Sequence, residues 1–153
     1  MVVFTKPESY ELQIVLYLKN KEYAKAYSLS KEFVECFNSE MVAHFLLMKS
    51  AFWLKKFDEA IKEGRKAFNL SHGEDLLTCA IILSNAYYLN GNPNEAYNLL
   101  VKIQSEGNAE VEKLLFLYSI ALNNNKEAIR HIDNLYKLNR KLAKEFIIGY
   151  LLK

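Results

Sequence analysis

The sequence predicts an all-α protein, an α-solenoid built from antiparallel helix pairs. Glycine and proline are scarce, with 5 and 2 residues in a chain of 153. A β-rich chain needs more of both for its tight turns. In addition, a short motif with a central alanine recurs along the whole chain at nearly constant intervals, which is typical of helical repeats.

The repeated motif places one alanine in the same local setting four times. It reads EYAKAYSL around Ala26, KFDEAIKE around Ala60, NPNEAYNL around Ala96 and NKEAIRHI around Ala128. Successive alanines are 34, 36 and 32 residues apart, and a period of about 34 is that of a helix–turn–helix unit. A small side chain at this place lets two antiparallel helices approach closely beside their turn.

Each unit is predicted to begin with an apolar helix, to pass through a short polar turn and to end with a more polar second helix. The first unit opens near Pro7. In the third unit, Asn92 is placed to cap the second helix, with Pro93 at its first position. First helices such as CAIILSNAYYL are apolar on more than one face, so they need neighbours on both sides. We therefore expect one domain over residues 1–153, with repeats at 7–40, 41–74, 75–108 and 109–140 and a C-terminal helix at 141–153.

These units resemble tetratricopeptide repeats along the whole chain. In LSNAYYLNGNPNEAYNLL, Leu83 and Ser84 take the family's Leu-Gly places, Tyr87 the tyrosine place and Ala96 the alanine place. When its turn is read as one residue short, the second unit fills the places with Phe45, Met48, Phe52, Phe57, Ala60 and Ala67. The resemblance implies a right-handed superhelix and an interaction protein without a cofactor.

The resemblance also implies which residues line a concave groove, because in this family the first helices form the inner wall. Asn85 is placed to hydrogen-bond the backbone of an extended peptide, with Trp53 and Tyr88 as rigid anchors. Packing of Trp53 against the next repeat is the alternative for that residue. The predicted groove residues are Leu46, Ser50, Trp53, Ile81, Asn85, Tyr88, Lys113 and Leu117.

The C-terminal segment LAKEFIIGYLLK reads as the start of another first helix, with Ile148-Gly149 at the Leu-Gly place. The terminal helix of a repeat array normally has a polar outer face, whereas this one is rich in apolar side chains. Packing on the fourth repeat is one explanation. The other is self-association, for which the candidate residues are Phe146, Ile148, Tyr150 and Leu151.

No residue pattern in the sequence indicates catalysis, a metal or a cofactor. His44, His72 and His131 have no carboxylate or thiol partner at the spacing of a catalytic triad or a metal site. No glycine-rich nucleotide motif occurs. Cys36 and Cys79 lie in apolar-periodic segments and are expected to be buried free thiols, with a disulfide or a metal role as the alternative. We therefore do not expect an enzyme.

Bulk composition favours a soluble intracellular protein of the cytoplasm and does not exclude the nucleus. The net charge of +2 is too small to indicate nucleic acid, although basic residues gather in the last third of the chain. The N-terminal MVVFTKPESYE lacks the pattern of a secretory signal. No apolar run reaches the roughly twenty residues of a membrane span.

The sequence thus predicts an adaptor or scaffold that binds a peptide or a helical segment of a partner protein in its groove. The alternative is a structural subunit of a larger assembly, which forms a homodimer or docks through its terminal helices. The first two units, from SYELQIVLYLKNKEYAKAY to FDEAI, resemble the N-terminal repeats of anaphase-promoting-complex scaffold subunits, which dimerise.

Overall fold

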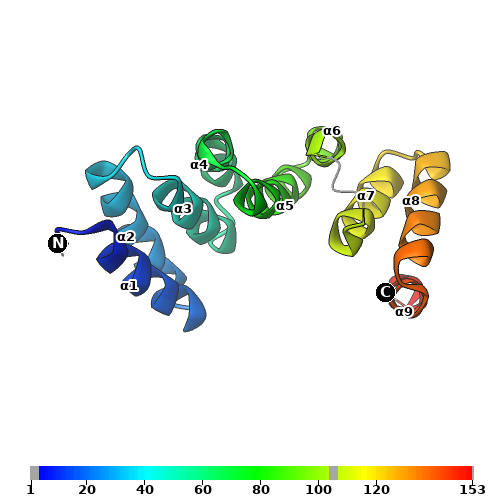
Figure 1. Cartoon of the computed structure of the whole chain (residues 1–153), viewed down its shortest axis with the longest axis horizontal. Coiled ribbons are helices and arrows are strands. Elements are labelled where there is room, and N and C mark those ends of the chain that lie inside the picture. The colour runs from blue at the N-terminus through cyan, green and yellow to red at the C-terminus, as the bar shows by residue number, and fades with distance from the viewer. Residues whose placement is uncertain (1–3, 104–106, 153) are drawn as a thin grey trace. The chain divides into compact units, whose positions relative to one another are not determined.

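The computed structural model describes residues 4–103 and 107–152, and these residues form nine α-helices and no β-strand (Figure 1). The prediction of an all-α fold made of antiparallel helix pairs is confirmed. The helices are α1 (Pro7–Lys19), α2 (Tyr23–Cys36), α3 (Met41–Trp53), α4 (Phe57–Leu70), α5 (Glu74–Leu89), α6 (Pro93–Ile103), α7 (Ala109–Ala121), α8 (Asn125–Leu138) and α9 (Arg140–Leu151).

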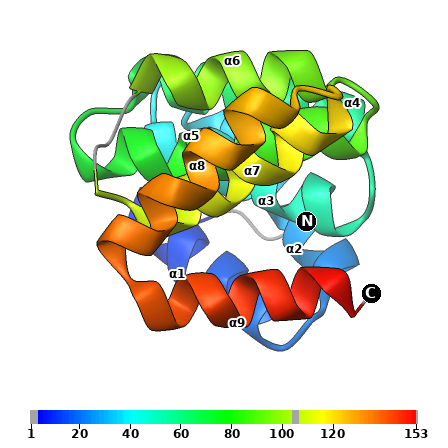
Figure 2. The same cartoon turned by 90° about the vertical axis from the view of Figure 1, so that its right-hand side faces the viewer.

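The chain divides after Asn90 into two compact units. Unit 1 contains α1 to α5, and unit 2 contains α6 to α9. In unit 1 each helix packs against the next, and α3 also contacts α1 and α5. In unit 2 the helices likewise pack in chain order, and Figure 2 shows α8 beside α7 with α9 following it. One domain over residues 1–153 stays a prediction.

The repeat boundaries predicted from the alanine spacing agree with the observed starts of the first helices. The helices α1, α3 and α7 begin at Pro7, Met41 and Ala109, which are the first residues of the expected first, second and fourth repeats. The helix α5 begins at Glu74 and α9 at Arg140, each one residue before its expected start.

All four aligned alanines are buried. The exposed fraction is 0% for Ala26, Ala60 and Ala96 and 2% for Ala128. Each lies in the first turns of a second helix, beside the turn that leads back from the first helix. At this position a larger side chain would force the two helix backbones apart, because the interior has no spare volume.

Every turn between a first and a second helix contains one residue in the left-handed backbone region. After α3, the Lys56 amide donates to the Ala51 carbonyl at 2.9 Å, a closure typical of the Schellman motif. A side chain is disfavoured in this backbone region, and only glycine adopts it freely. The four residues stand five positions before an aligned alanine and have φ between 56° and 86°: Lys21, Lys55, Gly91 and Asn123.

Each unit contains fully buried apolar side chains of its own. In unit 1 the fully buried rings of Tyr10 and Phe33 stack, with centroids 5.1 Å apart and planes 3° from parallel. The fully buried Ile14 extends this cluster along α1. In unit 2 the fully buried side chains include Tyr118 of α7 and Leu135 of α8. In each unit, buried side chains of a first helix and of the following second helix therefore contribute to the core.

A tyrosine–glutamate hydrogen bond links consecutive repeats within each unit. Tyr27 donates its hydroxyl to Glu59 at 2.5 Å, and Tyr97 donates to Glu127 at 3.1 Å. Each tyrosine directly follows an aligned alanine, and each glutamate directly precedes the next one. The bond to Glu59, together with burial, raises the pKa of Tyr27 to about 12. The pKa of Tyr97 is also raised, with burial as the larger cause and the Glu127 bond second.

Candidate functional site

Two residues predicted to line the groove lie in the core of unit 1. Leu46 is 3% exposed and Ser50 is 0% exposed. Leu46 belongs to the core cluster that contains Tyr10 and Ile14, and the Ser50 hydroxyl donates to the Leu46 carbonyl at 2.8 Å. Both side chains are therefore enclosed by the protein and offer no surface to a partner in this conformation.

On α3, the accessible residues come one position before the predicted groove residues Leu46 and Ser50, at Phe45 and Lys49. Counting 19 residues back from each aligned alanine gives an equivalent starting residue in every repeat: Pro7, Met41, Leu77 and Ala109. Reading the second turn as one residue short displaces this register by one. When the repeat is counted without a gap, the groove positions of α3 fall on residues that are all half-buried or exposed. They are Val42, Phe45, Lys49, Phe52 and Trp53.

We use the name first-helix face for a set of accessible residues at or near the predicted groove positions of α1, α3 and α5. On α5 they recur at helical spacing, so they share one stripe of that helix. Together, α1, α3 and α5 supply aromatic and aliphatic side chains with one amide and one central ammonium group. The first-helix face comprises Val15, Val42, Phe45, Lys49, Trp53, Ile81, Asn85, Tyr88 and Leu89.

Trp53 is both packed and accessible. Its ring stacks on Tyr23 of the preceding helix pair, with centroids 5.5 Å apart and planes 10° from parallel. Phe52 meets it edge-on at 5.7 Å. Half of the residue, 51%, nevertheless stays exposed. An indole held in this way loses little conformational entropy when a partner covers it.

The residues predicted on α5 lie at its accessible side. Ile81 and Asn85 are half-buried. Tyr88 is 37% exposed and Leu89 is 53% exposed at the C-terminal end of the helix.

The predicted groove residues of the fourth repeat belong to unit 2. Lys113 and Leu117 are half-buried one turn apart on α7. The Lys113 ammonium pairs with Glu110 at 3.1 Å. This pairing leaves α7 with a neutral, partly apolar stripe at these positions.

Of the residues predicted for self-association, two pack against α7 and two are exposed to solvent. Phe146 and Tyr150 meet the ring of Phe116 on α7 edge-on, at centroid distances of 5.6 Å and 5.3 Å, so they help to hold α9 in place. Ile148 is 58% exposed and Leu151 is 73% exposed. Packing and surface exposure therefore coexist on this helix, on different sides.

The histidines in the helices have carboxylate partners that the sequence spacing did not reveal. His44 Nδ1 lies 2.7 Å from Glu63 Oε2, and its Nε2 lies 2.7 Å from the Asn38 carbonyl. A carbonyl only accepts, so Nε2 donates, and one further proton lies between the ring and Glu63. His131 Nδ1 lies 2.7 Å from Glu112 Oε2. Both ring nitrogens of each histidine are engaged inside the fold, since His131 Nε2 contacts the Tyr97 hydroxyl at 3.1 Å.

These two buried pairs occupy equivalent positions with the residue types exchanged. His44 and Glu112 each stand 16 residues before an aligned alanine, and Glu63 and His131 each stand 3 residues after one. The imidazole therefore comes from the first helix in the second repeat and from the second helix in the fourth. Such pairs join the two helices of a hairpin, which is a structural use of histidine.

Within residues 4–103 and 107–152, no group of three or more His, Cys, Asp or Glu side chains is arranged to hold a metal ion. Cys36 and Cys79 are free thiols. Cys79 is buried as expected, and burial raises the pKa of its thiol. Cys36 is exposed at the end of α2, so its predicted burial is wrong. No helix in this part of the chain has the length and apolar character needed to cross a membrane.

Comparison with known proteins agrees with this architecture. The family model described as "Anaphase-promoting complex, cyclosome, subunit 3" matches residues 2–67, the region of the first two repeats. Solved structures of tetratricopeptide-repeat proteins superpose on most of the chain. The chain has the tetratricopeptide-repeat fold. No curated protein sequence matches it.

Three solved tetratricopeptide-repeat or related structures illustrate the likeness. MamA from Desulfovibrio magneticus RS-1 has a TM-score of 0.81 at 12% identity, covering 89% of this chain and 77% of that one. TTC0263 from Thermus thermophilus has a TM-score of 0.74 at 15% identity, covering 96% and 82%. YrrB, described as a TPR protein with an unusual peptide-binding site, has a TM-score of 0.73 at 14% identity, covering 86% and 68%.

Proposed function

We propose that this protein is a non-catalytic interaction module that binds a peptide or helical segment of a partner protein on the first-helix face of unit 1. The observation that carries the proposal is the exposure of large apolar side chains there. Trp53 is 51% exposed, Leu89 is 53% exposed and Tyr88 is 37% exposed. Accessible aromatic side chains held by their own packing are the usual anchors of protein interfaces.

The polar groups of the face suit a peptide backbone. Asn85 brings an amide to the same stripe of α5 as Tyr88, and an amide can accept from and donate to an extended backbone. Lys49 lies over the Phe45 ring at 5.9 Å, so a cation borders the aromatic surface. YrrB, which has the same fold, is described as having a peptide-binding site, and this supports a peptide ligand here.

Selection of random dodecapeptides on immobilised protein tests the proposal. Trp53 is the only tryptophan in the chain, so its fluorescence reports on binding at the face. We expect selected peptides to change this fluorescence and to lose at least about fivefold in affinity in Leu89→Ala, about 1 kcal/mol. The matched control is Leu70→Ala, an exposed leucine of α4 outside the face, which should bind normally. Unchanged affinity in both Leu89→Ala and Trp53→Ala would contradict the proposal.

A second candidate function is a structural subunit that self-associates through α9. The specific observation is the row of exposed apolar residues at its end: Ile148, Leu151 and Leu152, at 58%, 73% and 81%. Side chains exposed to this degree favour association when they lie together. The family that matches the first two repeats is named for a subunit of an assembly, which supports this reading in general terms.

Light scattering over a concentration series tests the second candidate. Ile148→Glu should abolish any concentration-dependent increase in mass, because it places a carboxylate in the apolar row. Lys126→Glu, which changes an exposed lysine of α8 away from this row, is the control and should leave the mass unchanged. A mass that equals one chain at every concentration of the wild-type protein would exclude self-association through this helix.

A further inference from the structure

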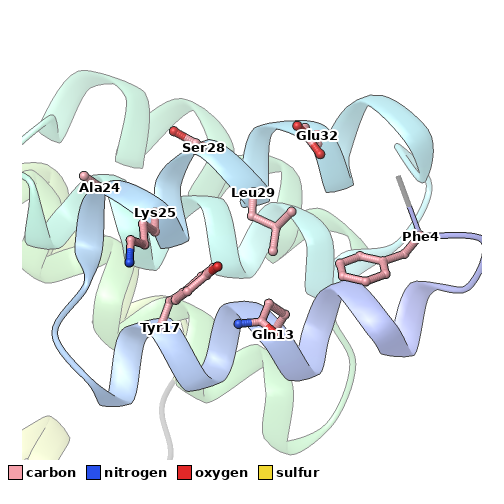
Figure 3. A pocket seen from close by; sticks show the side chains of 8 residues that line it. All are labelled: Phe4, Gln13, Tyr17, Ala24, Lys25, Ser28, Leu29 and Glu32. Atoms are coloured by element: carbon pink, nitrogen blue, oxygen red, sulfur yellow. The ribbon is translucent and has the colours of Figure 1, made fainter. Parts of the chain in front are cut away.

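A pocket of ≈ 510 Å³ opens between α1 and α2, away from the first-helix face (Figure 3). Gln13 and Tyr17 line it from α1, one turn apart, whereas Val15 of the first-helix face lies halfway between them and points to the other side of the helix. The volume is within the range of about 300–1,000 Å³ that is typical of ligand pockets. The remaining lining residues are Phe4, Ala24, Lys25, Ser28, Leu29 and Glu32.

The walls of the pocket are mostly apolar and are fixed by packing. Figure 3 shows Gln13 and Tyr17 reaching from α1 toward Leu29 of α2. Leu29 is 8% exposed and belongs to the core cluster of unit 1. Phe4 closes one end, with its ring edge-on to Tyr10 at 4.9 Å. An aliphatic chain can therefore lie between the Tyr17 ring and Leu29 with little rearrangement.

The two charged residues of the pocket differ in how they are compensated. The Lys25 ammonium pairs with Glu22 and also lies 5.7 Å above the Tyr17 ring. Glu32, in contrast, has a side-chain oxygen, Oε2, that is shielded from solvent and receives no hydrogen bond from the described residues. Lys25 and Glu22 neutralise each other, which leaves the Glu32 carboxylate without a cationic partner among the described residues.

An acceptor without a donor is unfavourable when it is shielded from water, and a carboxylate more so than a neutral group. A cation brought into the pocket would supply both the charge and the N–H donors. Gln13 and Ser28 add polar atoms that can orient such a group.

We propose that this pocket binds a lysine or arginine side chain presented by an extended peptide segment of a partner protein. The aliphatic stem lies against Tyr17 and Leu29, and the cationic head reaches Glu32. Basic side chains combine an apolar stem with a charged tip in this way. This second site is independent of the first-helix face, and its occupant differs from an apolar anchor in chemistry.

Titration by nuclear magnetic resonance tests the proposal with a defined probe. Acetyl-Ala-Ala-Arg-Ala-Ala-amide is added to the full chain, and the Leu29 methyl and Tyr17 ring signals are followed. We expect saturable shifts of both. The same peptide with citrulline, which keeps the shape and loses the charge, should bind at least about tenfold more weakly, as loss of a charge-assisted hydrogen bond predicts.

Glu32→Gln should abolish the preference for arginine over citrulline, while Glu35→Gln should keep it. Glu35 is an exposed glutamate of the same helix that does not line the pocket, so it matches the change in net charge. Thermal unfolding of both variants checks that the hairpin of α1 and α2 is intact. A Tyr17→Leu variant removes the ring that lines the pocket from α1, and it should weaken binding of the arginine peptide.

Equal binding of the arginine and citrulline peptides, or an unchanged preference in Glu32→Gln, would overturn the proposal. Free L-arginine amide distinguishes a peptide from a small cation. Weaker binding of the amide supports the peptide ligand, and equal binding overturns that part of the proposal. Trp53→Ala should have no effect, so failure of this site is distinguishable from failure of the first-helix face.

Discussion

Unit 1 and unit 2 start their helices in different ways. In unit 2, α7, α8 and α9 each begin after an asparagine whose side chain accepts from the amide three residues on: Asn108, Asn124 and Asn139. The helices of unit 1 follow Lys6, Glu22, Glu40, Lys56 and Gly73, none of which makes a side-chain cap bond. Unit 1 instead contains two stacked ring pairs, Tyr10–Phe33 and Tyr23–Trp53. The same hairpin fold is thus stabilised by local capping in one unit and more by aromatic packing in the other.

The buried histidine–glutamate pair is the feature that the two units share in exchanged form. In unit 1 the histidine stands on α3 and the glutamate on α4, and in unit 2 the order is reversed. In these two hairpins one group of each kind lies across the contact, and either helix supplies the histidine. Substitutions can test this statement directly.

The largest effect is expected at this pair in unit 1. His44→Glu places two carboxylates together in a buried site, and breaking such a pair costs about 3–5 kcal/mol. The exchange His44→Glu with Glu63→His reproduces the arrangement of unit 2 and should recover most of that loss. Urea unfolding of the two single variants and the double variant gives the coupling free energy. If the double variant loses as much free energy of unfolding as the two single variants together, the two orientations are not equivalent.

The helix caps come next in size. Asn124→Ala should lower the free energy of unfolding by about 1 kcal/mol, because the Glu127 amide loses its acceptor. Lys56 has φ −87° and ψ 67°, close to the −97° and 77° of Asn124. Lys56→Asn should therefore create a cap in unit 1 and raise stability by about 0.5 kcal/mol. Chemical denaturation measures both, and a loss of stability in Lys56→Asn would contradict this explanation.

Substitutions at the left-handed turn residues should change stability in opposite directions in the two units. Lys55 has φ 60°, so Lys55→Gly should stabilise unit 1 by roughly 0.5–1 kcal/mol by removing the Cβ strain. Gly91 has φ 86°, and Gly91→Ala should destabilise by a similar amount for the same reason. Thermal unfolding of each variant against the wild type is the measurement. Two changes of the same sign would be inconsistent with strain at these turns.

The smallest effect concerns the pH dependence of the two inter-repeat tyrosines. The raised pKa of Tyr27, about 12, means that its contribution to stability is complete below the unfolded value near pH 10 and is lost as the pH rises toward 12. Glu59→Gln should bring the pKa of Tyr27 back toward 10, because the hydrogen bond is the main cause of the shift. Glu127→Gln should leave the pKa of Tyr97 raised, since burial dominates there. Tyrosine ring signals followed through an alkaline titration distinguish the two.

Much of the fold could be predicted from one repeated small residue. The positions of Ala26, Ala60, Ala96 and Ala128 fix the period, and the observed first helices begin at or near the expected residues because the hairpin geometry has little freedom in length. In the second repeat, reading the turn before Ala60 as one residue short selects Leu46 and Ser50, which are buried. The unbroken count of 19 residues back from the alanine selects Phe45 and Lys49, which are partly accessible.

The side-chain pairs and the pocket were not accessible to the same reasoning. His44 and Glu63 are 19 residues apart and lie on different helices, so no local motif joins them. The pocket of Glu32 depends on how α1 and α2 lie against each other, and its residues have no unusual spacing. Pairing between helices is a property of tertiary packing, and a single sequence carries no separate signal for it.

The exchanged histidine–glutamate pair also affects which helices can pack together as the chain folds. Were α3 to dock wrongly on α8, two imidazole rings, those of His44 and His131, would meet in the interior. Were α7 to dock on α4, the carboxylates of Glu112 and Glu63 would face each other there. Each of these mistaken assemblies would bury a mismatched pair of titratable groups, which is unfavourable. The exchange of His and Glu between the two hairpins therefore disfavours both wrong pairings.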